Sequence, residues 1–194
     1  MAGTPAAIHA APRADAPTCT AEQTSTSPDG SGLRGTWQLC VRKNSVTFKA
    51  TCQKKSLFGF WQDTSCAADG TVIVAKDGKV LPQYAKGCVI TGDDLGGWAE
   101  RFGFFPPTML TSVGLVSHSL PCPAGQEAGR GFATHSSEGS IEDSLWFSCQ
   151  GAGTYTATLK QGRLYTQTGS DASASAQVTA EAKLHEVSVS APLC

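Results

Sequence analysis

The segment TWQLCVRKNSVTFKATC, residues 36–52, carries the clearest structural signal in the chain. From Val46 to Cys52, apolar residues stand at every second position and polar residues stand between them. This two-residue period is typical of a half-buried β-strand. We therefore predict strands over residues 36–41 and 45–52, joined by a turn at residues 42–44, with the basic side chains on the turn and on the outward face.

Short strand patterns separated by turn residues continue along the chain. The strongest is a hairpin around Asp77-Gly78, because a type I′ turn needs positive φ at both central residues and this pair tolerates it well. The other expected elements are turns at Asp69-Gly70 and Gln161-Gly162, a glycine-rich loop over residues 125–139, and strands over residues 71–75, 79–81, 88–91, 109–117, 144–149, 154–160 and 163–167. Residues 177–190 are one strand with a bulge near His185, or include a short helix over residues 180–185.

The domain organisation follows from composition. Residues 1–32 are poor in apolar groups and are predicted to be a flexible leader and polar segment. The aromatic stretch LGGWAERFGFFPP, residues 95–107, is interpreted as a junction between an N-terminal β half (33–94) and a C-terminal β half (108–194). With 21 glycines and almost no amphipathic helical pattern, the chain is predicted to be all-β: a disulfide-stabilised sandwich or barrel, with the two β halves packed together.

Eight cysteines indicate an oxidising compartment. None of them forms the close C-x-x-C pair that zinc and iron–sulfur sites use, so disulfides are expected and metal ligands are not. Their connectivity cannot be deduced from the sequence. They are Cys19, Cys40, Cys52, Cys66, Cys88, Cys122, Cys149 and Cys194. We expect a secreted, extracellular protein whose Ala/Pro-rich N-terminal segment is the leader left after a signal is removed.

Charge and hydropathy restrict the partners. The net charge is −1 and no apolar run is long enough to span a membrane, so neither nucleic acid nor a membrane span is expected. The basic residues between Gly30 and Gln62, where no acidic residue occurs, suit an anionic glycan or a solvated sheet face that resists aggregation. No cofactor is implied, and the oligomeric state is left open.

Two resemblances suggest what kind of protein this is. The first rests on Cys40, Cys52, the Gly59-Phe60-Trp61 segment and Asp77-Gly78. With these features, residues 36–83 resemble a cyanovirin-N homology module, a small β fold of carbohydrate-binding proteins. Cys66 is additional to that pattern, and the second half does not repeat it, so no sugar-contacting residue is transferred. More loosely, residues 145–194 resemble the C-terminal regions of fungal secreted cell-wall proteins.

These patterns favour a non-enzymatic binding protein that recognises carbohydrate or an extracellular, host or cell-wall surface partner. Loop aromatics beside polar groups can stack on sugar rings, which makes Trp61 and Trp98, with Asp93, Asp94 and Arg101, the predicted ligand-binding residues.

Two alternatives remain open. One is a small secreted hydrolase that uses His135, Glu138 and Glu142, although no nucleophile motif accompanies these residues. The other is an effector or inhibitor that occupies a protein partner through the aromatic junction.

Overall fold

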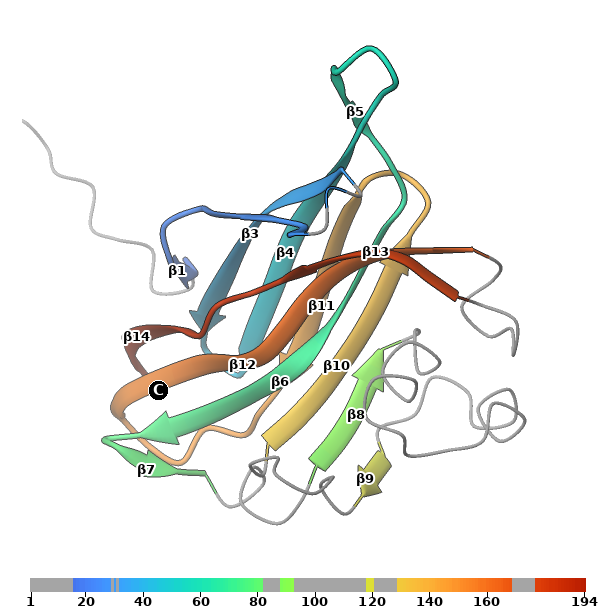
Figure 1. The fold of residues 1–194 in the computed structure, drawn as a ribbon. Coiled ribbons are helices and arrows are strands. Elements are labelled where there is room, and N and C mark those ends of the chain that lie inside the picture. The colour runs from blue at the N-terminus through green and yellow to red at the C-terminus, as the bar shows by residue number, and fades with distance from the viewer. Residues whose placement is uncertain are drawn as a thin grey trace, which may run out of the picture.

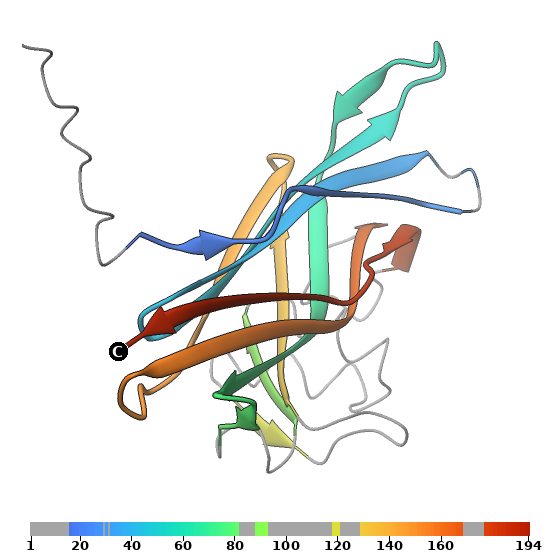
Figure 2. The same ribbon diagram turned by 90° about the vertical axis from the view of Figure 1, so that its left-hand side faces the viewer.

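The computed structural model describes residues 16–28, 30, 32–81, 88–92, 118–120, 129–168 and 177–194. In these residues the chain forms β-strands and their connections, arranged in two sheets (Figures 1 and 2). The predicted disulfide-stabilised all-β fold is confirmed. Each sheet combines strands from before and after residues 95–107, so the two sheets are not the two predicted β halves. The junction itself lies outside the described residues, as does the strand expected at 109–117.

Sheet A is antiparallel and runs in the order β1-β3-β4-β11, with β2 beside β3 and β5 beside β4. Its strands are β1 (Thr18–Cys19), β2 (Gln23–Thr26), β3 (Leu33–Arg42), β4 (Ser45–Lys55), β5 (Trp61–Asp63) and β11 (Ser140–Trp146). The predicted β3–β4 hairpin is confirmed. Asn44, with a φ of 65°, closes its turn, since asparagine tolerates the left-handed region better than most residues.

Sheet B runs in the order β13-β12-β6-β10-β8-β9, with β14 beside β12 and β7 beside β6. Its strands are β6 (Cys66–Lys76), β7 (Lys79–Val80), β8 (Cys88–Gly92), β9 (His118–Leu120), β10 (Gly129–Ser136), β12 (Gly153–Thr168), β13 (Gln177–Lys183) and β14 (Val187–Leu193). The β8–β10 pair is parallel. The predicted turn at Asp77-Gly78 is confirmed, with φ of 49° and 82°.

The core lies between the inner faces of the two sheets. On β4, Phe48 packs against Phe132 of β10 with ring centroids 5.0 Å apart, which joins sheet A to sheet B. Trp37 is 1% exposed, and its indole nitrogen donates to Ser25 Oγ at 3.0 Å, so its one polar atom is satisfied. Gly35 of β3 is also buried, facing the Leu164 side chain of β12, where the two sheets approach closely.

Strand β12 passes straight through Gln161-Gly162, where the sequence predicted a hairpin turn. Gln161 has a φ of 53°, and the pairing of β12 with β6 shifts between residues 160 and 163. Two residues of β12 therefore face the single Gly70 of β6, which is a β-bulge. A Cβ at Gly70 would lie only 3.1 Å from the Gly162 Cα. The turns predicted at 161–162 and at Asp69-Gly70 are both wrong, because both pairs lie inside paired strands.

Residues 177–193 form two strands rather than one. Both β13 and β14 pair with β12, and residues 184–186 separate them. The Leu184 amide donates to the Gly162 carbonyl at 2.9 Å, so this break lies opposite the bulge in β12. The irregularity expected near His185 is therefore a break between strands, and the helix considered over residues 180–185 is wrong.

Two segments predicted to lack regular structure contain strands. Part of the polar segment 1–32 forms β1 and β2, which pair with β3 through backbone hydrogen bonds that polar side chains do not prevent. Part of the glycine-rich loop 125–139 forms β10, which pairs with β6 on one side and β8 on the other. Pairing on both sides satisfies the backbone and outweighs the weak strand preference of glycine.

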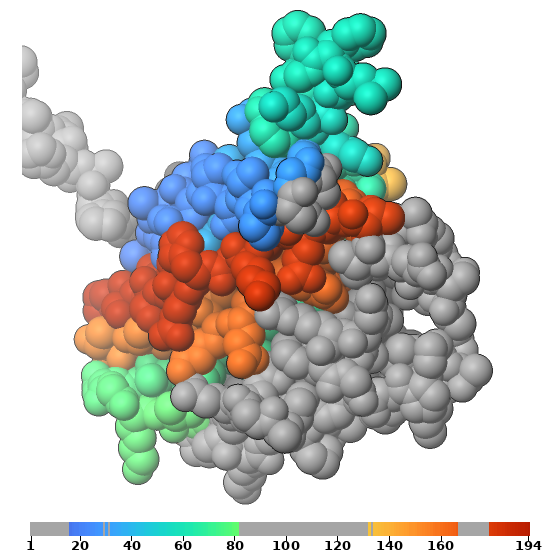
Figure 3. Space-filling model, in the orientation of Figure 1, coloured from blue at the N-terminus to red at the C-terminus, as the bar shows by residue number. Residues whose placement is uncertain are grey.

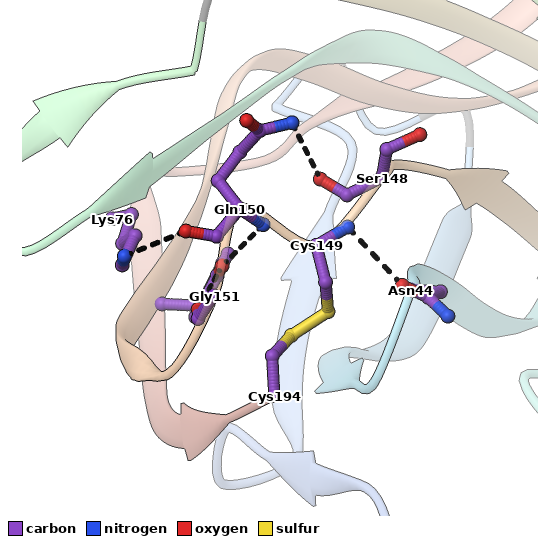
Figure 4. Close-up of a disulfide and its surroundings, with 8 residues drawn as sticks. Asn44, Lys76, Ser148, Cys149, Gln150, Gly151 and Cys194 are labelled. Atoms are coloured by element: carbon purple, nitrogen blue, oxygen red, sulfur yellow. Dashed lines mark hydrogen bonds between the residues drawn. A yellow bond between two sulfur atoms is a disulfide. The ribbon is translucent and has the colours of Figure 1, made fainter.

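Three disulfides join described cysteines: Cys19–Cys40, Cys52–Cys66 and Cys149–Cys194. Cys122 lies outside the described residues, and the disulfide bonding expected of Cys88 and Cys122 stays a prediction. The Cys149–Cys194 bond ties the C-terminal residue to the segment that leads into β12 (Figure 4). There the Cys149 amide donates to Asn44 Oδ1 at 3.3 Å, which links this segment to the β3–β4 turn.

Candidate functional site

The outward face of sheet A carries a broad array of polar and aromatic side chains. Alternation along β3 and β4 buries Trp37, Phe48 and their neighbours and turns the intervening residues outward. Strand pairing then brings residues that are distant in the chain into rows across this face. We call this surface the outer face of sheet A. Its members are Thr24, Thr26, Arg34, Thr36, Gln38, Arg42, Lys49, Thr51, Gln53, Lys55, Trp61, Asp63, Ser140, Glu142, Ser144 and Trp146. Ser45 and Thr47 lie in the same rows but are buried.

The middle of the outer face is an open groove of about 370 Å³, lined by both polar and apolar residues. The hydroxyls of Thr36 and Thr51 lie 2.6 Å apart on neighbouring strands. Beside them, Lys49 Nζ lies 3.7 Å from Glu142 Oε2, and both side chains are largely exposed. The polar residues that line the groove are Glu22, Thr36, Gln38, Lys49, Thr51, Ser140 and Glu142. The groove therefore offers hydroxyl, amide and charged groups to a polar ligand along several strands.

A tryptophan stacked on an arginine lies at one end of this face. The guanidinium carbon of Arg34 is 4.3 Å from the centroid of the Trp61 ring. The Arg34 Nε and Nη2 atoms both donate to Gln53 Oε1, at 3.0 and 2.8 Å. In turn, Gln53 Nε2 donates to Asp63 Oδ1 at 3.1 Å. These contacts orient Arg34, and Arg34 covers one face of the half-buried indole of Trp61.

A second tryptophan lies at the opposite end. Trp146 ends β11 opposite Ser45 and is 60% exposed. The Arg42 guanidinium carbon lies 6.0 Å from its ring centroid, and Arg42 Nε donates to Ser45 Oγ at 2.9 Å. The outer face thus has an aromatic ring near each end and hydroxyl-bearing strands between them. Since Arg34 and Arg42 are eight positions apart on β3, the two ends are separated by roughly 26 Å of strand.

The predicted ligand-binding residues are only partly described. Trp61 belongs to the outer face of sheet A, while Trp98, Asp93, Asp94 and Arg101 lie outside the described residues. Sequence reasoning assigned Trp146 and Phe147 to one strand and did not select Trp146 as a binding residue. The structure buries Phe147 and exposes Trp146. A local signal was available: Ile141, Leu145 and Phe147 alternate with polar residues along the chain, and this two-residue period places Trp146 on the polar, outward side.

The residues considered for a hydrolase do not form one cluster. Glu142 points outward from sheet A toward Lys49. His135 lies on β10 at the parity opposite to the buried Phe132, so it points outward from sheet B. Glu138 lies in the exposed turn between β10 and β11. The described structure therefore places His135 and Glu142 on opposite faces of the two-layered fold.

A buried ion-pair cluster lies beside the bulge in sheet B. Arg163 is 4% exposed; its Nε donates to Asp69 Oδ2 at 2.9 Å, and its Nη1 donates to Glu181 Oε2 at 2.9 Å. The guanidinium also lies 4.3 Å from the Tyr165 ring centroid.

The environment of Arg163 keeps it charged. Burial lowers the pKa of the Arg163 guanidinium, but attraction to Asp69 and the hydrogen bonds to Glu181 and Asp69 outweigh burial and raise that pKa above its ordinary value. The stabilisation that this raised pKa provides is therefore fully present at neutral pH and is lost only as the pH rises through it.

Two further types of site are absent from the described part of the chain. No group of three or more histidine, cysteine, aspartate or glutamate side chains gathers there in a way that could hold a metal ion. The same residues include no helix of the length and apolar character that a membrane crossing requires.

Comparison with protein-family models, with curated proteins and with solved structures found no match to this chain. The resemblance of residues 36–83 to a cyanovirin-N homology module, and that of residues 145–194 to fungal cell-wall proteins, therefore stay predictions.

Proposed function

We propose that this chain is a secreted, non-enzymatic binding protein that recognises carbohydrate through the outer face of sheet A. The observation that carries the proposal is the position of Trp61 and Trp146 at the two ends of a row of hydroxyl, amide and charged groups. Sugars present apolar C–H faces that stack on aromatic rings and hydroxyls that exchange hydrogen bonds with such side chains. Three disulfides support an extracellular location, because disulfides persist in oxidising compartments.

The shape of the site supports binding rather than catalysis. The groove is open and spans neighbouring strands, and Glu142 within it is paired with Lys49. An open face with polar groups along several strands suits an extended oligosaccharide, which contacts a surface at successive sugar units. The Thr36–Thr51 hydroxyl pair lies in the middle of that path and can both donate and accept hydrogen bonds.

A glycan-array screen of the oxidised protein, followed by titration of the best ligand, tests the proposal. We expect Trp146→Ala and Trp61→Ala to weaken binding by at least about tenfold, because each removes the ring on which a sugar would stack. Thr51→Val, which keeps the shape and removes one hydroxyl, should weaken binding roughly two- to tenfold.

The chain offers a matched control on the other sheet. Thr158 and Ser188 form a similar hydroxyl pair at 2.8 Å across β12 and β14, without a tryptophan among the described contacts. Thr158→Val should leave glycan binding unchanged. A blank array would refute the proposal, and so would a selective glycan whose affinity is the same for the wild type and the variants at Trp61, Trp146 and Thr51.

A further inference from the structure

The apex of the β4–β5 hairpin, residues 56–60, exposes large apolar side chains. The hairpin projects beyond both sheets and stands clear of the body of the molecule (Figures 1 to 3). Leu57 is 103% exposed, Phe58 is 87% exposed and Phe60 is 70% exposed. Adjacent exposed apolar side chains of this size mark interaction surfaces, because isolated ones are common and clustered ones are not.

Hydrogen bonds hold the apex in this form. The Ser56 amide donates to the Phe60 carbonyl at 2.7 Å, and the Gly59 amide donates to the Ser56 carbonyl at 3.0 Å. The Phe60 amide donates to Ser56 Oγ at 3.1 Å. Gly59 has a φ of 85°, which a residue with a side chain rarely adopts. The closed turn therefore keeps Leu57 and Phe58 pointing away from the core.

The charge beside the apex is positive. Lys54 and Lys55 are both exposed and directly precede it. Successive residues of a strand point to opposite faces, so the two lysines flank the hairpin on both sides. No acidic residue occurs from Ser31 to Gln62. Asp63, beyond that range, accepts a hydrogen bond from Gln53. The apex is thus an apolar tip with a cation on each flank.

We propose that this apex inserts into a membrane surface that carries anionic lipid headgroups. A narrow projecting tip can bury its side chains in the acyl boundary without the shape complementarity that a protein pocket requires. Lys55 lies three residues before Phe58, so their Cα atoms are at most about 10 Å apart, and the turn over residues 56–59 brings them closer. Interfacial segments bury their apolar side about 5–10 Å deep, so the lysines would reach the phosphate layer when the tip is inserted. This inference does not depend on carbohydrate binding.

Sedimentation of the full chain with vesicles tests the inference. We expect binding to vesicles of phosphatidylcholine with 30% phosphatidylserine, about 30% being enough to give a strongly negative surface, and much weaker binding to phosphatidylcholine alone. The triple variant L57S/F58S/F60S should bind the anionic vesicles at least about a hundredfold more weakly. The variant K54Q/K55Q should bind about fivefold more weakly for each lysine, and added salt should weaken the wild type.

The control is K79Q/V80S on β7, which removes one exposed lysine and one exposed apolar side chain elsewhere. It should bind as the wild type does, and all variants should unfold cooperatively as the wild type does. If the wild type sediments with neither vesicle, the inference is wrong and the apex would instead suit a protein partner. Binding that the triple variant retains would also overturn it.

Discussion

The close approach of the two sheets at Gly35 and Leu164 allows a quantitative test of the fold. Gly35 faces inward from β3, and a Cβ at this position would overlap Leu164 Cδ1 of β12. The same Cβ would lie 2.9 Å from the Thr51 carbonyl oxygen, which belongs to the adjacent β4 and cannot rotate away. Gly35→Ala should therefore destabilise the protein although the change adds only one methyl group.

The magnitudes follow from packing. Overpacking of a close-packed core costs about 1–3 kcal/mol of stability. Alanine also lowers the chain entropy of the unfolded state relative to glycine, which offsets about 0.4–1 kcal/mol of that cost in Gly35→Ala. Leu164 is completely buried, so Leu164→Ala should cost about 2–5 kcal/mol through lost burial and a cavity. In the double variant, the new methyl group occupies part of the vacated space. The double variant should therefore be about 1–2 kcal/mol more stable than the sum of the two single changes predicts.

Urea unfolding of the wild type, both single variants and the double variant, with disulfides intact, measures this coupling free energy. Gly78→Ala is the control, because Gly78 lies in the β6–β7 turn and no atom lies within 4 Å of the added Cβ. Its change in the free energy of unfolding should therefore add to that of Leu164→Ala without coupling. A coupling between Gly35 and Leu164 of less than about 0.5 kcal/mol would mean that β3 and β12 do not face each other in this way.

Two further changes test the buried charges and the C-terminal disulfide. Asp69→Asn should destabilise the protein by about 3–5 kcal/mol, because it leaves the buried Arg163 without its principal counter-charge. Glu142→Gln breaks only an exposed ion pair and should cost less than about 1 kcal/mol of stability. Equal losses of unfolding free energy for the two variants in urea would contradict this difference. Replacing both Cys149 and Cys194 with serine removes a disulfide whose cysteines are 45 residues apart in the chain. Loop-closure entropy predicts that the free energy of unfolding then falls by about 4 kcal/mol. If the double serine variant unfolds at the same temperature as the wild type, this disulfide does not stabilise the fold.

The sequence by itself determined the elements whose signals are local. The apolar alternation from Val46 to Cys52 predicted β4 and its buried face, because the two-residue period of a strand is a property of consecutive residues. Asp77-Gly78 predicted a hairpin turn, because positive φ is a local requirement of that turn. The widely spaced cysteines predicted disulfides but not their partners.

Tertiary structure alone decided the features that depend on a partner strand. Gln161-Gly162 is compatible with a turn or with a bulge, and the pairing of β12 with Gly70 of β6 selected the bulge. The candidate site depends on pairing in the same way. Trp61 and Trp146 share one face because β5 and β11 both pair with β4 in registers that align the two tryptophans with its outward residues. The local alternation along β11 already favours Trp146 outward, but which residues of β4 lie beside each tryptophan is set by contacts between distant segments that no local pattern records.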